Sequence, residues 1–247
     1  MATVLQYDAA GLANGSAIVV GTAGNGDTAA PSEVHSAWTI ATGTDQSYPR
    51  LRGVQAASTA GNLAWTGYNL TSLGMRVMYS PSAIASSSNT IIEGVTSAGG
   101  IAFRVDQAGT GGANHLRIRD AAGTQNAEGT VAITGGTVYW LQLTLTPTAL
   151  VLYVYDQTGH IIDTITGAST YGTVRKLTLG PFLTTPTLPA MDFAHLLMTD
   201  QPAQPGLPFT PPSVNIATTW WDGTAEQPVA LTWWDGASEQ PISLDIP

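Results

Sequence analysis

The chain has 247 residues, of which 43% are hydrophobic, only 10% are Asp, Glu, Lys or Arg, and none is cysteine. Eight basic against 17 acidic residues give a formal net charge of −9, so phosphate backbones and anionic membrane surfaces would repel the molecule. The composition excludes disulfides and thiol chemistry and argues against nucleic acid or membrane as a partner. The apolar content is enough for one substantial core.

The N-terminal residues, Met1 to Asp8, contain neither the basic region nor the apolar run of a secretory signal peptide. No apolar run in the chain approaches the ~20 residues of a membrane-spanning helix. We therefore expect a product that is made in the cytoplasm without a signal peptide.

Apolar and polar residues alternate with a period of two along most of the chain, which is the pattern of β-strands. Strands are predicted, in chain order, at 3–7, 16–20, 49–56, 73–79, 90–95, 101–106, 116–120, 138–146, 149–155, 160–166, 175–179 and 192–198. Segment 149–155 is apolar on both faces, as expected of a central strand. Because no segment shows a convincing helical pattern, residues 1–200 are predicted to form one antiparallel β-sandwich.

The composition changes after residue 200. Five prolines follow within a short segment, at Pro202, Pro205, Pro208, Pro211 and Pro212, so residues 201–213 are predicted to be an extended linker. Residues 214–247 contain two copies of a 13-residue repeat, at 219–231 and 232–244. Each copy is predicted to form a β-hairpin around an Asp-Gly turn. Two hairpins this short bury too little apolar surface to be stable alone, so we expect this tail to pack against a partner.

The repeat supplies the candidate contact residues of the chain. They are the Trp-Trp-Asp triplets Trp220, Trp221 and Asp222, and Trp233, Trp234 and Asp235. Alternation along a strand places the two tryptophans of each triplet on opposite faces, so one of them can be exposed or enter an interface. Exposed tryptophan is common at contact sites, which makes these six residues the predicted interface or ligand contacts. Trp65 and Trp140, in contrast, are predicted to fill the core.

The order of strands across residues 60–200 resembles a known fold. The segments that carry the resemblance are 73–79, 101–105, 139–145 leading into 150–159, 177–180 and 191–196. Together they resemble the concanavalin A-like or laminin-G-like jelly roll. With the tail of Trp-Asp-Gly repeats, the layout is similar to structural proteins of tailed bacteriophages of actinobacteria, particularly minor tail proteins.

The sequence contains no clear motif of a catalytic or nucleotide-binding site. All the glutamates are isolated, at Glu33, Glu93, Glu128, Glu226 and Glu239, so the closely spaced pair of carboxylates that glycosidases of this fold carry on one strand is absent. Asp156 and Asp163 could face each other across the turn at Gly159, although a solvated hairpin end explains them equally well. Residues 24–29 fit a glycine-rich nucleotide fingerprint, but Pro31 follows and no helix is predicted, so a loop is expected.

Metal ligands are also sparse. His35, His115, His160 and His195 are scattered, without a pair at metal-binding spacing. The nearest approximation to the clustered calcium ligands of lectin-type jelly rolls is the set Asn114, Asp120 and Asn126. We therefore predict no catalytic residue, no cofactor and no metal site, and a protein that is not an enzyme.

The resemblance implies a structural component of a phage virion, most simply a minor tail protein that docks through its C-terminal repeat. Its partners would be other virion proteins and further copies of itself, with a trimer as one arrangement, and it could display a surface that binds the host or a glycan. Two alternatives stay open. One is a capsid decoration or head fibre protein, and the other is a carbohydrate-binding module for glycans of the host cell surface.

Overall fold

The computed structural model describes residues 2–35, 37–42, 49–54, 61–84, 86–109, 113–180 and 189–208, together with the strands of the tail. For residues 37, 42, 49 and 54 and for the tail strands it describes the backbone alone. The chain divides into two compact units, Met1–Pro208 and Phe209–Pro247. Within the described residues every regular element is a strand, and no helix is long and apolar enough to cross a membrane.

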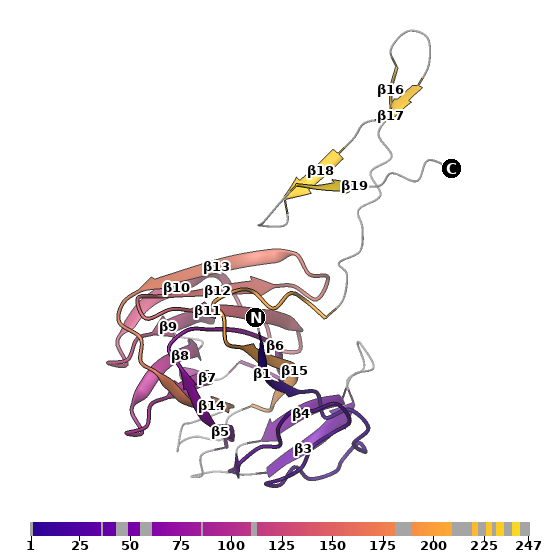
Figure 1. Ribbon diagram of the computed structural model, residues 1–247. Coiled ribbons are helices and arrows are strands. Elements are labelled where there is room, and N and C mark those ends of the chain that lie inside the picture. Colours follow the sequence, from indigo (N-terminus) through magenta and orange to yellow (C-terminus); the bar gives the residue numbers. More distant parts are fainter. Residues whose placement is uncertain are drawn as a thin grey trace. The chain divides into compact units, whose positions relative to one another are not determined.

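Two antiparallel sheets make up unit 1 (Figure 1). Sheet A has the strand order β13-β12-β11-β6-β15-β4-β3, and β1 also pairs with β15. Its strands are β1 (Thr3–Tyr7), β3 (Ala37–Thr42), β4 (Pro49–Val54), β6 (Leu73–Pro81), β11 (Tyr139–Leu145), β12 (Ala149–Tyr155), β13 (Ile161–Ala168) and β15 (Met191–Thr199).

Sheet B has the order β10-β9-β8-β7-β14-β5-β2. Its strands are β2 (Glu33–Val34), β5 (Leu63–Leu70), β7 (Asn89–Val95), β8 (Ile101–Gln107), β9 (His115–Arg119), β10 (Gln125–Ala132) and β14 (Val174–Leu179). Neighbours such as β6 and β15 are far apart in sequence, as in a jelly roll. The predicted all-β antiparallel sandwich is therefore confirmed.

The core lies between the two sheets. Leu141, Leu143 and Leu145 of β11 face it from sheet A, and Phe103 and Val105 of β8 face it from sheet B. Burial of such side chains is the main force that holds the sheets together.

The two tryptophans that were predicted to fill the core are both buried, but in different places. Trp65 belongs to the core cluster and meets the ring of Tyr7 edge to face, with the ring centroids 5.3 Å apart. Trp140 lies on the opposite face of β11 from Leu141, because successive side chains of a strand alternate between faces. It therefore sits outside the core, where it stacks on His195.

A short segment, residues 200–208, lies against the outer face of sheet A; we call it the strap. Arg76 donates from Nη1 to the carbonyl oxygen of Gly206 at 2.8 Å, and the Gly206 N–H donates to Oε1 of Gln142 at 3.1 Å. Residues 201–208 are thus the part of the predicted linker, 201–213, that belongs to unit 1.

Most predicted strands coincide with observed ones. Segment 149–155 lies between β11 and β13, next to the edge of sheet A, and its side chains alternate between buried and half-buried along most of its length, so it is an interior strand but not one buried on both faces. The strand predicted at 16–20 is wrong, because this segment makes only an isolated bridge between Ala17 and Thr39. Four observed strands, β2, β3, β5 and β10, were not predicted from the sequence. Strand β10 is mostly polar and forms the edge of sheet B, so it lacks the alternation on which the prediction depends.

The described backbone of unit 2 consists of two hairpins, which confirms the predicted β-hairpin repeat. β16 (Thr219–Trp221) pairs with β17 (Glu226–Pro228), and β18 (Leu231–Trp234) pairs with β19 (Glu239–Ile242). The register is the same in both, since Trp220 lies opposite Gln227 and Trp233 lies opposite Gln240. Asp222 and Asp235 lie outside the described residues, as do the side chains of the four tryptophans, so their contact role stays a prediction.

Candidate functional site

Four neighbouring strands of sheet B, from β7 to β10, carry a charged outer face. Phe103 and Val105 point into the core, so Arg104 and Asp106 between and after them point outward. The same alternation on β9 leaves every second side chain outside the core. The residues that form this polar face are Thr90, Glu93, Arg104, Asp106, Arg117, Arg119 and Glu128.

The strand register brings like charges together on the polar face. Arg104 of β8 lies directly opposite Arg119 of β9, an arrangement that destabilises a sheet unless the charges are compensated. The compensation comes from two carboxylates. Glu93 of β7 binds the guanidinium of Arg104, and Asp106 binds Nε of Arg119.

A third ion pair continues this row toward the sheet edge. Arg117 contacts Glu128 of β10, with Nε 3.2 Å from Oε2. Burial alone would raise the pKa of Glu128, but hydrogen bonds from Arg117 and Gln125 and the charge of Arg117 hold the pKa of this carboxyl below its ordinary range.

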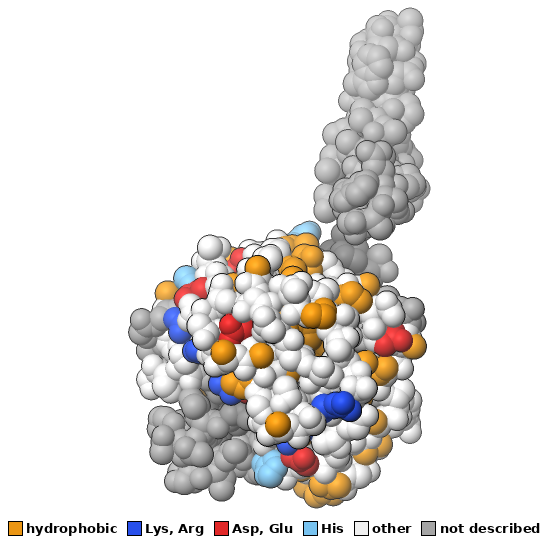
Figure 2. All heavy atoms as spheres, turned by 60° about the vertical axis from the view of Figure 1, so that its left-hand side comes forward, with side chains coloured by type: hydrophobic (Ala, Val, Ile, Leu, Met, Phe, Trp, Pro, Cys, Tyr) orange, Lys and Arg blue, Asp and Glu red, His pale blue; other side chains and the backbone are white. Residues whose placement is uncertain are grey.

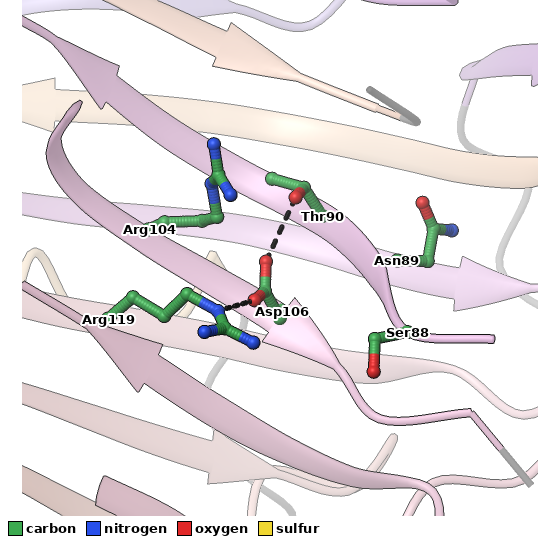
Figure 3. A pocket seen from close by; sticks show the side chains of 6 residues that line it. All are labelled: Ser88, Asn89, Thr90, Arg104, Asp106 and Arg119. Carbon is green, nitrogen blue, oxygen red and sulfur yellow. Dashed lines mark hydrogen bonds and ion pairs between the residues drawn. The ribbon is translucent and has the colours of Figure 1, made fainter. Parts of the chain in front are cut away.

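The polar face is hollowed beside the two opposed arginines. The hollow has a volume of about 130 Å³ and is lined by Ser88, Asn89, Thr90, Arg104, Asp106 and Arg119. Figure 3 shows the two guanidinium groups on one side of the hollow and Ser88 and Asn89 on the other, with Asp106 between them. No aliphatic or aromatic side chain belongs to this lining, which is therefore built to meet a polar ligand.

Asp106 organises the hollow. Only 3% of this residue is exposed, and both of its carboxylate oxygens are engaged. Oδ1 accepts a hydrogen bond of 2.9 Å from the Thr90 hydroxyl, and Oδ2 accepts from Arg119. Arg119 also donates from Nη1 to the carbonyl oxygen of Gly123 at 3.1 Å. Burying such charges costs stability unless they are paired this closely, and the pairs in turn fix the guanidinium groups in one orientation.

The concentration of charge is unusual for this chain. The polar face holds three of the eight Lys and Arg residues of the whole sequence. Figure 2 shows one face of the molecule, on which acidic and basic side chains form only a few small groups among hydrophobic side chains and the white atoms of the backbone and of other side chains. Other ion pairs of unit 1 lie outside this face: Arg50 and Arg52 pair with Asp192, and Lys176 pairs with Glu33.

The structure separates the two aspartates that could have faced each other at Gly159. Asp156 caps the turn, because its Oδ1 accepts from the N–H groups of Thr158 and His160. Asp163 points to the other sheet, where its Oδ2 accepts from the N–H groups of two residues of β10. These two carboxylates therefore do not converge on a common point.

Two residues that were compared with the calcium ligands of lectins, Asp120 and Asn126, make hydrogen bonds within nearby turns and loops. Asp120 accepts from the N–H groups of Ala122 and Thr124, and Asn126 donates to the Tyr171 hydroxyl at 2.8 Å, so they make a turn and a loop contact. Among the residues that the structure describes, no group of three or more His, Asp or Glu side chains could hold a metal ion.

Residues 24–29 begin a turn that is fixed by Asp27, whose Oδ1 and Oδ2 accept from the N–H groups of Asp8 and Gly24. No helix follows this turn, in agreement with the predicted loop.

The hollow was not predicted from the sequence. The one sequence feature that points to it is the spacing of charged residues in two strands. Arg104 and Asp106, like Arg117 and Arg119, are separated by one residue in otherwise apolar strands. That spacing shows that each pair shares a face, but only the pairing of β8 with β9 brings Arg104 and Arg119 together.

Comparison with known proteins shows the fold. No protein-family model and no curated protein matches the chain, whereas many solved structures do. One is that of botulinum neurotoxin type C, whose cell entry depends on interaction with two ganglioside molecules. It matches with a TM-score of 0.53 and 11% identity over 82% of this chain and 48% of the toxin chain. The chain thus spans about half the length of this toxin chain.

Two further structures show the same similarity. The cellulose-induced protein Cip1 matches with a TM-score of 0.53 and 12% identity, over 70% of this chain and 89% of its own. A sialidase of Trypanosoma rangeli matches with a TM-score of 0.51 and 12% identity, over 82% of this chain and 31% of the sialidase. At such low identity the similarity establishes the architecture alone. Unit 1 shares its antiparallel β-sandwich architecture with these proteins, which is consistent with a jelly-roll-like fold.

Proposed function

We propose that unit 1 is a carbohydrate-binding module and that the hollow on the polar face of sheet B holds part of the glycan. The observation that carries this proposal is the lining of the hollow, which consists of guanidinium, carboxylate, amide and hydroxyl groups on an open sheet face. Such groups recognise a ligand that is rich in hydroxyls, because each offers directed hydrogen bonds in a fixed geometry. The ion pairs fix that geometry before the ligand arrives, which lowers the cost of binding.

Two kinds of observation support this role. The hollow itself favours binding over hydrolysis, because Asp106 is the one carboxylate in its lining and both of its oxygens are engaged. Hydrolysis of a glycosidic bond ordinarily needs two carboxylates on either side of that bond. The fold is also shared with part of a neurotoxin whose cell entry depends on interaction with gangliosides, which is compatible with a glycan-binding role for unit 1.

Binding to a panel of immobilised glycans, followed by titration calorimetry of the hits with the full-length protein, tests the proposal. A Ser88→Trp variant would fill the hollow without removing an ion pair, and we expect it to abolish binding. The matched control is Ser97→Trp in the exposed turn that joins β7 to β8, which should leave binding intact. A panel without any hit would contradict the proposal, as would a hit that Ser88→Trp leaves unchanged.

A second candidate function is the structural role in a phage particle that the sequence suggests, either in the tail or as a capsid decoration or head fibre protein. The observation that favours it is the pair of hairpins in unit 2, which repeat the same register with two tryptophans each. Two equivalent hairpins suit attachment to a symmetric assembly. If particles lacking residues 214–247 still incorporate the protein at normal copy number, the repeat is not the anchor. The two functions are compatible, since one concerns unit 1 and the other unit 2.

A further inference from the structure

We infer that the glycan bound by this hollow carries an acidic group, a carboxylate or a sulfate ester, that bridges Arg104 and Arg119. This inference rests on the proposed function and specifies the class of its ligand. It depends on which atoms of the hollow are still available for hydrogen bonds.

The lining of the hollow has an excess of positive charge. Arg104 and Arg119 contribute two cations, and Asp106 contributes one anion. Glu93, which pairs with Arg104, does not line the hollow. Glu93 nevertheless holds Arg104 directly, so the four charges of the site balance; the imbalance is one of position, because two cations but only one carboxylate face a ligand in the hollow.

The two arginines of the lining each keep a donor group for a ligand. Arg104 uses Nε and Nη2 to hold Glu93, and Arg119 uses Nε and Nη1 to hold Asp106 and the carbonyl oxygen of Gly123. Within the described part of the chain, Nη1 of Arg104 and Nη2 of Arg119 have no partner. Both side chains are about a quarter exposed, at 27% and 25%, so these two groups can be reached from solvent.

The charged acceptor of the hollow, Asp106, is in contrast engaged, and the acceptors that are left are uncharged: the amide oxygen of Asn89, which is buried without a partner among the described residues, and the hydroxyl of Ser88. Both oxygens of Asp106 already accept hydrogen bonds, and one of the two donors is the hydroxyl of Thr90. A ligand group that accepts hydrogen bonds and carries negative charge fits such a site better than a neutral hydroxyl does. Two guanidinium groups that line the same side of the hollow are well suited to an anionic oxygen group, which can take a charge-assisted bond from each.

The size of the hollow limits what enters it. Its 130 Å³ is the space of only a few water molecules of about 30 Å³ each, and a whole small-molecule site ordinarily has about 300–1,000 Å³. The acidic substituent and the adjoining edge of one sugar ring would enter, while the rest of the glycan lies over the open face of sheet B. The acidic group is therefore expected to decide specificity.

Matched forms of the same glycans test this inference with the full-length protein. Each glycan backbone is presented as the neutral sugar, the uronic acid, the methyl ester of that acid and the sulfate ester. We expect the acidic forms to bind at least about tenfold more tightly than the ester or the neutral form, as charge-assisted bonds imply. Affinity for the acidic form should fall as NaCl rises from about 0.05 to about 0.5 M, because salt screens this attraction. The stronger of the two acidic forms identifies the group.

Two double variants locate the effect. Asp106→Asn with Arg119→Gln replaces the ion pair of the hollow by a neutral pair of similar shape, and we expect the preference for the acidic form to disappear. The control, Arg117→Gln with Glu128→Gln, neutralises the neighbouring ion pair of the same face outside the hollow and should keep the preference. Urea unfolding of both variants verifies that they fold, and the comparison of acid with methyl ester on the natural sequence does not depend on them.

The outcomes separate this inference from the proposed function. Equal binding of acid and methyl ester would overturn the acidic ligand and leave carbohydrate binding standing. Absence of binding to every form would overturn both. Preference for the acid that survives in the Asp106→Asn, Arg119→Gln variant would show that the acidic group binds elsewhere.

Discussion

The imidazole of His195 stacks on the indole of Trp140 on the outer face of sheet A, with ring centroids 5.6 Å apart and planes inclined by 30°. His195 has a left-handed backbone conformation, with φ of 52°, at the bulge where the pairing of β15 with β6 shifts register. Its Nδ1 lies 3.0 Å from Oδ1 of Asp8. The stack and the ion pair together fix the bulge against the segment that follows β1.

Asp8 should make this region sensitive to acid. Burial by itself would raise the pKa of Asp8, but the hydrogen bond and charge of His195, the hydrogen bond of Gln6 and the charge of Arg76 lower it below its ordinary value of 3.8. A carboxyl whose pKa is lower in the folded state stabilises the fold above its unfolded pKa, and this contribution is lost as the pH falls through the folded value. Asp8→Asn should therefore be less stable than the natural protein at pH 6, and the difference should shrink below about pH 4.

Urea unfolding midpoints of both proteins between about pH 2 and pH 7 measure this difference. Because the two proteins share every other titrating group, the difference between their unfolding midpoints reports the contribution of Asp8 to stability. A constant difference down to the lowest pH would contradict the assignment.

Gly74 should be intolerant of a side chain. A Cβ at this position would collide with the carbonyl oxygen of Ala203, so the strap would have to leave the sheet. We expect Gly74→Ala to destabilise unit 1 by about 1–3 kcal/mol, as overpacking does. Gly100→Ala is the matched control, because its Cβ would meet only the Thr96 hydroxyl at an ordinary 3.5 Å. Urea unfolding of the two variants checks the difference, and equal stabilities would show that the strap is not packed tightly on Gly74.

Asp163 should link the edges of the two sheets. It lies on β13 of sheet A, and its Oδ2 accepts hydrogen bonds of 2.8 and 3.0 Å from the N–H groups of Thr130 and Val131 on β10 of sheet B. Asp163→Ala would leave both N–H groups without this acceptor, and we expect a loss of about 1 kcal/mol, since the site is partly exposed. Hydrogen exchange at Thr130 and Val131 should become faster in this variant, while Asp163→Asn, whose side chain retains an acceptor oxygen, should preserve part of the protection. Unchanged exchange in Asp163→Ala would show that these bonds do not form in solution.

Unit 1 should fold without unit 2. The chain divides at Pro208, and the strap that ends there is bonded to sheet A. A protein comprising residues 1–208 should unfold in one cooperative transition at the Tm of unit 1 in the full chain. Calorimetry of both proteins measures this, and a large drop in Tm would mean that unit 2 contributes to the stability of unit 1. A shorter protein that ends at residue 200 should have a lower Tm than the protein comprising residues 1–208, because it lacks nearly all of the strap.

The sequence by itself determined the class of fold. Period-two alternation located most strands of both sheets, although 149–155, which is apolar on both faces, lies next to the edge of sheet A and not at its centre. The repeated Trp-Trp-Asp-Gly segments predicted hairpins, and hairpins with one shared register are found. These features are local, because a strand pattern or a turn is decided by residues within a few positions of one another.

Only the tertiary structure decided which residues meet. Alternation shows that Arg104 and Asp106 share a face, but it does not state which strand lies beside theirs. The pairing of β8 with β9 places Arg119 opposite Arg104, and the pairing of β7 with β8 brings Glu93 to the same guanidinium. Likewise, Trp140 stacks outside the core on His195, whose bulge lies in a distant part of the chain. Contacts of this kind depend on strand order and register across the whole sandwich, which no local pattern encodes.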